Sequence, residues 1–172
     1  MPQPRPEKFI GKLAIYRNEP VYVMDLTVKG IEQRVNGYVS AGEDWLNGIT
    51  FKVRNISKKN IVFIYASLIF PDAKDAKGIP FVLDLRYGSD PKVGPAPPRQ
   101  QPLKPEEAAE FVISDDLYQS FKRGIETHVT LIKNLNVVHI DVVKVVFDDD
   151  TSWATGSFMH RDPNNPTRWV DN

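Results

Sequence analysis

The sequence predicts a mainly β protein in which two antiparallel sheets pack face to face as a sandwich. The stretch 49–70 carries most of this prediction, because a polar turn separates two apolar segments in it. Apolar and polar residues alternate over 49–55, as in a strand with one buried face, whereas 61–70 is apolar almost throughout, as in a strand buried on both faces. A third apolar segment, 137–147, precedes three aspartates and a returning segment, 151–159, which is the pattern of a hairpin.

Composition narrows the classes of function before any element is placed. The 172 residues, 41% hydrophobic and 26% charged, suit one domain with a sizeable core. Lysine plus arginine and aspartate plus glutamate both number 22, so no net charge favours nucleic acid as a partner. The absence of cysteine excludes disulfides, thiolate nucleophiles and cysteine zinc sites. No apolar run reaches the roughly 18 residues of a membrane span, so no membrane-spanning segment is expected.

The first residues are expected to form an extended tail, 1–19, ahead of a single sandwich domain, 20–170. Three of the first six residues are prolines, and no apolar segment there matches the core of a signal peptide. The compartment stays open: either the protein is cytoplasmic, or it is exported, periplasmic or secreted, with its leader removed.

Strands in the first half follow from alternation and turn residues. Alternation predicts a strand over 21–28, and the pair Asn36-Gly37 predicts a tight hairpin between 31–35 and 38–39. Three further strands are expected at 49–55, 61–70 and 79–87, the second of them ending at Pro71.

In the second half, a strand over 107–113 leads into a short helix. Ser114 followed by Asp115 and Asp116 is a helix-start signal, and Gly124 is expected to fray the helix. The hairpin strands follow at 137–147 and 151–159, and the residues from 160 onward are expected to be irregular.

A proline-rich loop, 88–105, is expected inside the domain. It contains six prolines and little that can be buried. Loops of this length are uncommon within compact domains and are either functional or disordered. This loop is therefore the first place to look for a contact surface.

Seven or eight strands with one short helix have the count and spacing of an immunoglobulin-like antiparallel sandwich, although the Cys…Trp…Cys pattern of antibody domains is absent. Several segments stand out: Asp44-Trp45-Leu46, FKVRNISKKNI, Leu103-Lys104-Pro105 before EFVI, VVFDDDTSWATG, and Arg161 to Trp169. Together they resemble a group of small, uncharacterised bacterial proteins. The resemblance spans roughly residues 40 to 170 and implies a single immunoglobulin-like or fibronectin-like sandwich, often exported. It implies no particular activity, because a shared sandwich serves unrelated functions.

No motif indicates catalysis, and neither a metal nor a cofactor is expected. The three histidines, His128, His139 and His160, show no zinc-binding spacing, and no serine lies in a nucleophile-elbow sequence. The aspartates 148–150 are explained by turn chemistry, because adjacent carboxylates point in different directions while calcium needs many converging oxygens.

The three tryptophans are expected either to pack in the interior or to form part of a binding surface. Trp45 is expected to cover the core and Trp153 to pack between the sheets. Trp169 either packs back on the sandwich or anchors a partner. A carbohydrate-binding module would need two or more of these rings exposed and coplanar.

We predict a non-catalytic interaction domain that binds another protein through the 88–101 loop and the neighbouring strand ends, or through a strand edge. The candidate contact residues are Tyr87, Asp90, Lys92, Val93, Arg99 and Trp169. Two alternatives stay open: a carbohydrate-binding accessory module, and a hydrolase whose site is assembled only in space.

Overall fold

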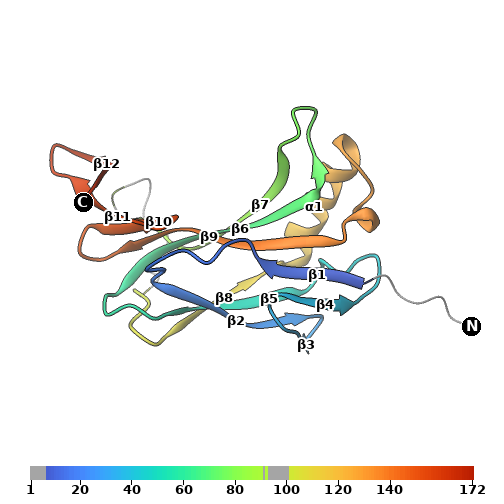
Figure 1. The fold of residues 1–172 in the computed structure, drawn as a ribbon, viewed down its shortest axis with the longest axis horizontal. Coiled ribbons are helices and arrows are strands. Elements are labelled where there is room, and N and C mark those ends of the chain that lie inside the picture. The colour runs from blue at the N-terminus through green and yellow to red at the C-terminus, as the bar shows by residue number, and fades with distance from the viewer. Residues whose placement is uncertain (1–6, 91, 93–100) are drawn as a thin grey trace, which may run out of the picture.

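A computed structural model describes residues 7–90, 92 and 101–172 of the protein as a β-sandwich with a single α-helix (Figure 1). The strands, in chain order, are β1 (Glu7–Lys12), β2 (Val21–Val28), β3 (Ile31–Glu32), β4 (Gly37–Ser40), β5 (Ile49–Asn55), β6 (Ile61–Lys74), β7 (Pro80–Gly88), β8 (Ala108–Val112), β9 (Val137–Phe147), β10 (Thr151–Ala154), β11 (Ser157–Asp162) and β12 (Asn165–Asp171). The helix α1 (Asp115–His128) and a 3₁₀ turn, η1 (Ile132–Asn134), lie between β8 and β9. The predicted class, a mainly β sandwich with one helix, is confirmed.

The smaller sheet contains four strands in the order β3-β2-β5-β8. Its strands alternate as the sequence predicts, because Val23 and Phe51 are buried while Tyr22 is exposed on the opposite face. Phe51 also stacks on Phe111 of the paired strand β8, with ring centroids 5.3 Å apart. This sheet forms the lower layer in Figure 1.

The larger sheet has β6 near its centre. β6 pairs antiparallel with β7 on one side and with β9 on the other, and the sheet continues from β9 through β10 and β11 to β12. On the side of β9 away from β6, β10 pairs with its second half and β1 pairs with its first half. β1 runs parallel to β9 and pairs in turn with β4. The β1–β9 pair makes this sheet mixed, whereas the sequence had predicted antiparallel pairing throughout.

The interior between the sheets is apolar. Phe51 from the smaller sheet and Ile64 and Val142 from the larger one are all fully buried, as predicted. Removing one such side chain from water contributes about 1.5–3 kcal/mol. The alternation of apolar residues therefore identifies the core correctly in both layers.

Helix α1 closes one side of the sandwich. Phe121 of the helix packs against Phe70 of β6, with ring centroids 4.7 Å apart. Ser114 is the N-cap, as predicted, and its hydroxyl accepts a hydrogen bond from the backbone N–H of Leu117. The predicted fraying at Gly124 is wrong, because the helix continues to His128. Among the described residues, no helix has the length and apolarity needed to cross a membrane.

Residues 7–12, predicted as part of an extended tail, form strand β1. The return strand after Asn36 pairs with β1 and not with 31–35, so the predicted tight hairpin is wrong. Asn36 does adopt the left-handed backbone expected of a turn, with φ of 64°. The partner strand, however, lies far away in the sequence, where Phe9 and Tyr38 meet with ring centroids 5.3 Å apart.

The predicted bounds of two strands, 61–70 and 151–159, are wrong, one near a proline and the other near a glycine. β6 runs through Pro71 to Lys74, because its register to β7 shifts after Phe70, and proline is tolerated at such a bulge. The predicted return strand 151–159 is two strands, β10 and β11, joined by a turn at Thr155-Gly156 where both residues have positive φ.

The segment expected to be irregular, from residue 160 onward, contains the end of β11 and all of β12. With β1 and the division of 151–159 into β10 and β11, this brings the described part of the chain to twelve strands, where seven or eight were predicted. The additional strands are short or lie at the ends of the chain, where alternation has too few residues to be recognised.

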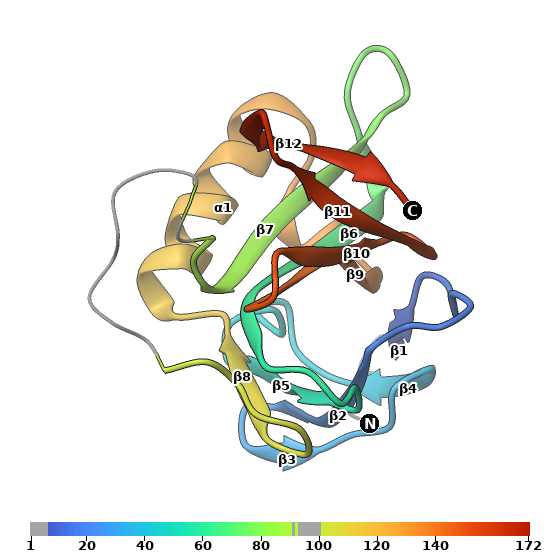
Figure 2. The same cartoon turned by 90° about the vertical axis from the view of Figure 1, so that its left-hand side faces the viewer.

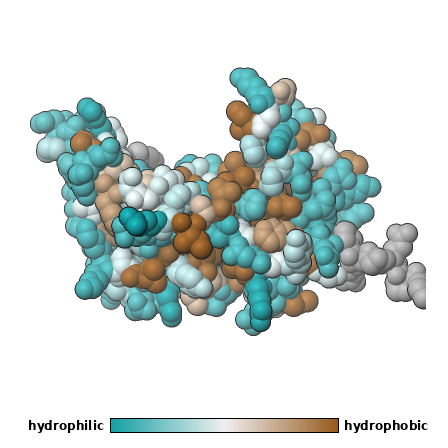
Figure 3. Space-filling model, in the orientation of Figure 1, coloured by the Kyte–Doolittle hydropathy of each residue, from teal (hydrophilic) through white to brown (hydrophobic). Residues whose placement is uncertain are grey.

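The outer face of the larger sheet is hollowed. The β6–β7 hairpin and the β11–β12 hairpin project from this face (Figure 1), and a depression lies between them (Figure 3). β6 was predicted to be covered on both faces. Its inward residues, including Ile64 and Leu68, are fully buried, but the outward residues Phe63 and Tyr65 are only half-buried. This partly open face is where the candidate site lies.

Candidate binding site at the β11–β12 hairpin

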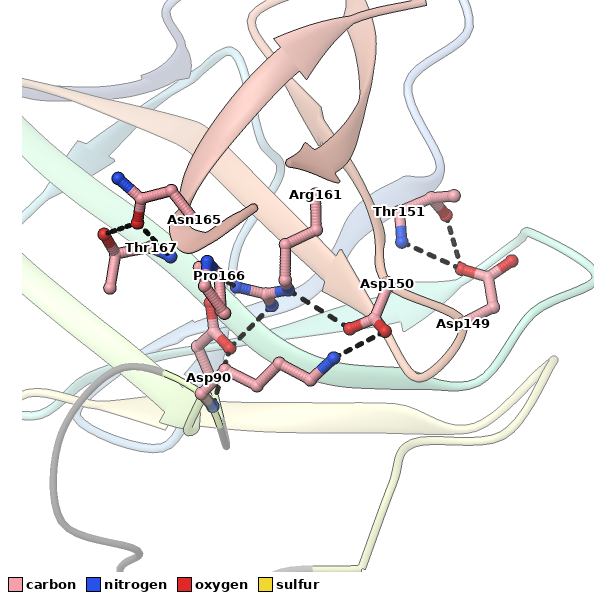
Figure 4. Close-up of polar contacts among 9 residues, drawn as sticks. Asp90, Asp149, Asp150, Thr151, Arg161, Asn165, Pro166 and Thr167 are labelled. Carbon is pink, nitrogen blue, oxygen red and sulfur yellow. Dashed lines mark hydrogen bonds and ion pairs between the residues drawn. The ribbon is translucent and has the colours of Figure 1, made fainter. Parts of the chain in front are cut away.

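A buried arginine holds Asp90, which follows β7, against the C-terminal strands. Arg161 lies on β11, and only 5% of its side chain is exposed. Its guanidinium donates to the Oδ1 atom of Asp90 at 2.8 Å and to the Oδ1 atom of Asp150 at 3.1 Å, and it also donates to the carbonyl oxygen of Pro166 (Figure 4). Because three acceptors from different segments converge on one planar cation, the geometry around Arg161 is fixed.

Two further side chains complete this corner of the molecule. Lys92 pairs with the second oxygen of Asp150 at 2.6 Å. The Lys92 ammonium and the Arg161 guanidinium together hold the pKa of the Asp150 carboxyl below its usual value. Trp169 lies directly across from Arg161 in the β11–β12 pair, with the guanidinium carbon 4.3 Å from its ring centroid. We call these five residues, Asp90, Lys92, Asp150, Arg161 and Trp169, the Arg161 corner.

A pocket of about 340 Å³ opens beside the Arg161 corner. Its lining comes from four strands and the start of the 88–105 segment: Phe63, Arg86, Gly88, Ser89, Asp90, Lys144, Thr167 and Trp169. We call it the Trp169 pocket. The Lys144 Nζ atom lies 4.7 Å from the Trp169 ring centroid, so the indole contacts two cations. Desolvation lowers the pKa of the Lys144 ammonium, while the Asp90 carboxylate raises it and the Arg161 charge lowers it by smaller amounts.

The six predicted contact residues separate into three groups. Asp90, Lys92 and Trp169 come together in the Arg161 corner. Tyr87 does not join them, because it shares the inward face of β7 with buried Leu85, and its hydroxyl donates to the carbonyl oxygen of Gln101 at 3.2 Å. The other two, Val93 and Arg99, lie outside the described residues.

Four charged residues of the site were not predicted: Arg86, Lys144, Asp150 and Arg161. Arg161 was assigned to an irregular tail, and nothing local marks it as buried. Arg86 and Lys144 each punctuate an apolar strand, as an outward-facing residue does. That signal places them on one face, but it does not show that β7 and β9 carry them to opposite sides of Tyr65.

The aspartates of the 148–150 turn are each used by neighbouring side chains. Asp148 accepts from the amide of Asn60 at 2.8 Å, Asp149 pairs with Lys59 at 2.7 Å, and Asp150 belongs to the Arg161 corner. Within residues 7–90, 92 and 101–172, no three acidic or histidine side chains are grouped so as to hold a metal ion.

The tryptophans take the positions expected for two of them. Trp45 and Trp153 are fully buried, and Trp45 donates from its indole nitrogen to the carbonyl oxygen of Leu135 at 3.1 Å. Trp169 is the only tryptophan of the described chain with an exposed surface. A platform built from two exposed tryptophans is therefore not formed.

The edge of the larger sheet is a second predicted contact surface. Within the described residues β7 pairs with β6 alone, so its other side is a sheet edge. α1 lies alongside β7 in both views of the fold (Figures 1 and 2). Because a neighbouring helix is one of the ways in which proteins cover an edge, the Trp169 pocket is the more open of the two surfaces.

Comparison with known proteins finds no match for this chain. No family model matches the chain, and neither a curated protein nor a solved structure is similar to it. The immunoglobulin-like classification and the resemblance to small bacterial sandwich proteins therefore stay predictions.

Proposed function

We propose that this protein is a non-catalytic binding domain that contacts another protein through the Trp169 pocket and the adjoining Arg161 corner. One observation carries the proposal: Arg161 ties Asp90 and the β11–β12 hairpin together beside a pocket with a partly exposed tryptophan. Recognition surfaces are commonly built in this way, from connecting segments held by a rigid scaffold. Tryptophan and arginine are also the residues that contribute most often to interface affinity.

The chemistry of the corner supports binding over catalysis. The carboxylates of Asp90 and Asp150 are engaged by cations. Ion pairing lowers the pKa of Asp150, which makes its carboxylate a weaker base at neutral pH. Groups held in this manner position a surface and are poorly suited to proton transfer.

The proposal is tested by retrieving partners from an extract of the source cells on immobilised protein. We expect Trp169→Ala to reduce recovery of a saturable partner at least about tenfold, as for an interface anchor. The matched control is Tyr22→Ala, which removes an aromatic ring that is 61% exposed on the smaller sheet. Circular dichroism and thermal unfolding would confirm that both variants fold. Equal recovery by wild type and Trp169→Ala would refute the proposal.

A further inference from the structure

The Trp169 pocket holds two cations for which the described part of the chain supplies no acceptor. Arg86 on β7 and Lys144 on β9 are both cross-strand neighbours of Tyr65 on β6. Arg86 lies over the Tyr65 ring at 5.8 Å, and Lys144 lies over the Trp169 ring at 4.7 Å. Across the described residues, neither side chain makes an ion pair or a hydrogen bond, whereas Arg161 next to them has three acceptors.

This part of the surface is positive although the whole chain is neutral. Arg86, Lys92, Lys144 and Arg161 supply four cations, and Asp84, Asp90 and Asp150 supply three carboxylates, so the local formal charge is +1. The chain as a whole has a formal net charge of zero. The excess is placed where one side chain is partly desolvated, which strengthens its attraction for an anion. Desolvation lowers the pKa of Lys144, and the nearby Asp90 carboxylate offsets this only in part.

The size and surroundings of the pocket select the kind of anion. A volume of about 340 Å³ admits one side chain with its neighbours, at the lower end of ligand sites. Phe63 and Trp169 offer apolar contact next to the cations. Asp84, exposed on β7 next to Arg86, together with Asp90 and Asp150 would repel a continuous phosphate backbone. A single carboxylate flanked by apolar residues fits these constraints.

We propose that the Trp169 pocket binds a glutamate or aspartate carboxylate from an acidic, partly apolar segment of the partner protein, through Lys144 and Arg86. This inference rests on the proposed function, since it names the chemistry that the binding surface recognises. Arg86 can hold a carboxylate by two parallel hydrogen bonds, and Lys144 adds a point charge from the opposite side of Tyr65. Trp169 then contacts the adjoining apolar residue.

The test uses the full chain labelled with ¹⁵N and a blocked peptide of alternating glutamate and leucine. The protein gives three indole N–H resonances, from Trp45, Trp153 and Trp169, and Trp169→Phe identifies the third. We expect the Trp169 resonance alone to shift saturably as the peptide is added to about 5 mM, a range that detects millimolar affinity. The matching peptide of glutamine and leucine should cause at least a tenfold smaller shift.

Three variants make the test specific. Lys144→Gln and Arg86→Gln should each weaken binding at least about tenfold, which corresponds to loss of one charge-assisted contact. Lys52→Gln is the control, because Lys52 is paired with Asp25 on the smaller sheet and should leave the affinity unchanged.

Several results would overturn the carboxylate assignment. These are equal binding of the glutamine peptide, equal weakening by Lys52→Gln, no shift of Trp169, or tighter binding of inorganic phosphate or of oligothymidylate. Partner recovery that depends on Trp169, together with no response to the glutamate peptide, would keep the proposed function and reject this inference. Failure of both experiments would reject the binding surface altogether.

Discussion

Two lysines of this protein lie over tryptophan rings, and their surroundings differ in burial and in hydrogen-bond acceptors. Lys8 lies 5.8 Å from the centroid of Trp45, and Lys144 lies 4.7 Å from that of Trp169. Desolvation lowers the pKa of both ammonium groups. Lys8 is fully buried, however, whereas Lys144 lines an open pocket.

The difference lies in the acceptors. The Lys8 Nζ atom donates to the carbonyl oxygens of Leu135 at 3.0 Å and Lys133 at 3.2 Å, and to the Oδ1 atom of Asn136 at 2.8 Å. Lys144 has the same kind of aromatic neighbour but no acceptor within the described residues. A buried cation with its hydrogen bonds satisfied holds a structure together, whereas an unsatisfied cation at a pocket wall is free to bind a ligand. Whether the protein supplies hydrogen-bond acceptors, more than residue type, distinguishes a structural lysine from a ligand-binding one.

The largest expected effect is on the free energy of unfolding, when Lys8 is replaced. Lys8→Met leaves one buried and two part-buried acceptors without their donor and should lower the free energy of unfolding by about 4 kcal/mol. Lys144→Met, the matched variant, should change it by less than about 0.5 kcal/mol. Urea unfolding followed by tryptophan fluorescence measures both. Similar losses in the two variants would show that Lys144 is also a structural residue.

The next effect concerns the Arg161 corner, where two carboxylates and one backbone carbonyl accept hydrogen bonds from the buried cation. Arg161→Met strands the carboxylate of Asp90, of which only 11% is exposed, and should cost about 3 kcal/mol. In a double-mutant cycle with Asp90→Asn, we expect a coupling energy of about 2 kcal/mol. Additive effects in urea unfolding would contradict the arrangement described for this corner.

For Asp141, a buried carboxylate on the same outer face, we expect substitution to stabilise the protein, in contrast to the two substitutions above. Burial raises the pKa of Asp141, and its Oδ1 atom has no hydrogen-bond partner within the described residues. Wild-type stability from this group is therefore highest when it is protonated and falls as the pH rises from the unfolded value of 3.8 through the folded pKa. Asp141→Asn should stabilise the protein by about 1 kcal/mol at pH 7.

The gain from Asp141→Asn should shrink as the pH is lowered toward that unfolded value. Asp25→Asn is a suitable control, because Asp25 is an exposed partner of Lys52. Parallel urea titrations at neutral and acidic pH give the two differences. A destabilised Asp141→Asn protein at pH 7 would show that the charged form of Asp141 is favoured in the fold.

The smallest expected effect is a shift in the titration midpoint of Lys144. The Arg161 charge lowers the pKa of Lys144, and the Asp90 carboxylate raises it. Arg161→Met should therefore move the Lys144 midpoint upward, and Asp90→Asn should move it downward. Side-chain carbon resonances of lysine, followed by NMR through the alkaline range, measure the midpoint. Movement of both variants in the same direction would mean that the corner rearranges when either partner is lost.

Local sequence patterns predicted the strands that alternate over enough residues. The bounds of β2, β5 and β9 agree with the prediction, and Ser114 caps the helix where expected. The pairing of β4 with β1 and the presence of β12 were missed. These elements are short, and their partners are either distant in sequence or reached through a bulge, so no local periodicity indicates them.

The candidate site was predicted only in part, for a related reason. Asp90, Lys92 and Trp169 were chosen because they lie in or near a loop and a tail. Arg161, which unites them, was not chosen, because its burial follows from the pairing of β11 with β12. Arg86 and Lys144 were not chosen either, because nothing local in the sequence shows that β7 and β9 bring them to one pocket.

The sequence by itself determined which residues turn toward the core, since the alternation of apolar side chains has a period that only a strand satisfies. It also determined the helix start and the main turns, which depend on neighbouring residues. Only the tertiary structure decided which strands pair, which charges meet and which are left without a partner. Those features arise from contacts between residues such as Asp90 and Arg161, which are 71 positions apart. Contacts over such separations depend on the whole packing arrangement and leave no periodic trace along the chain.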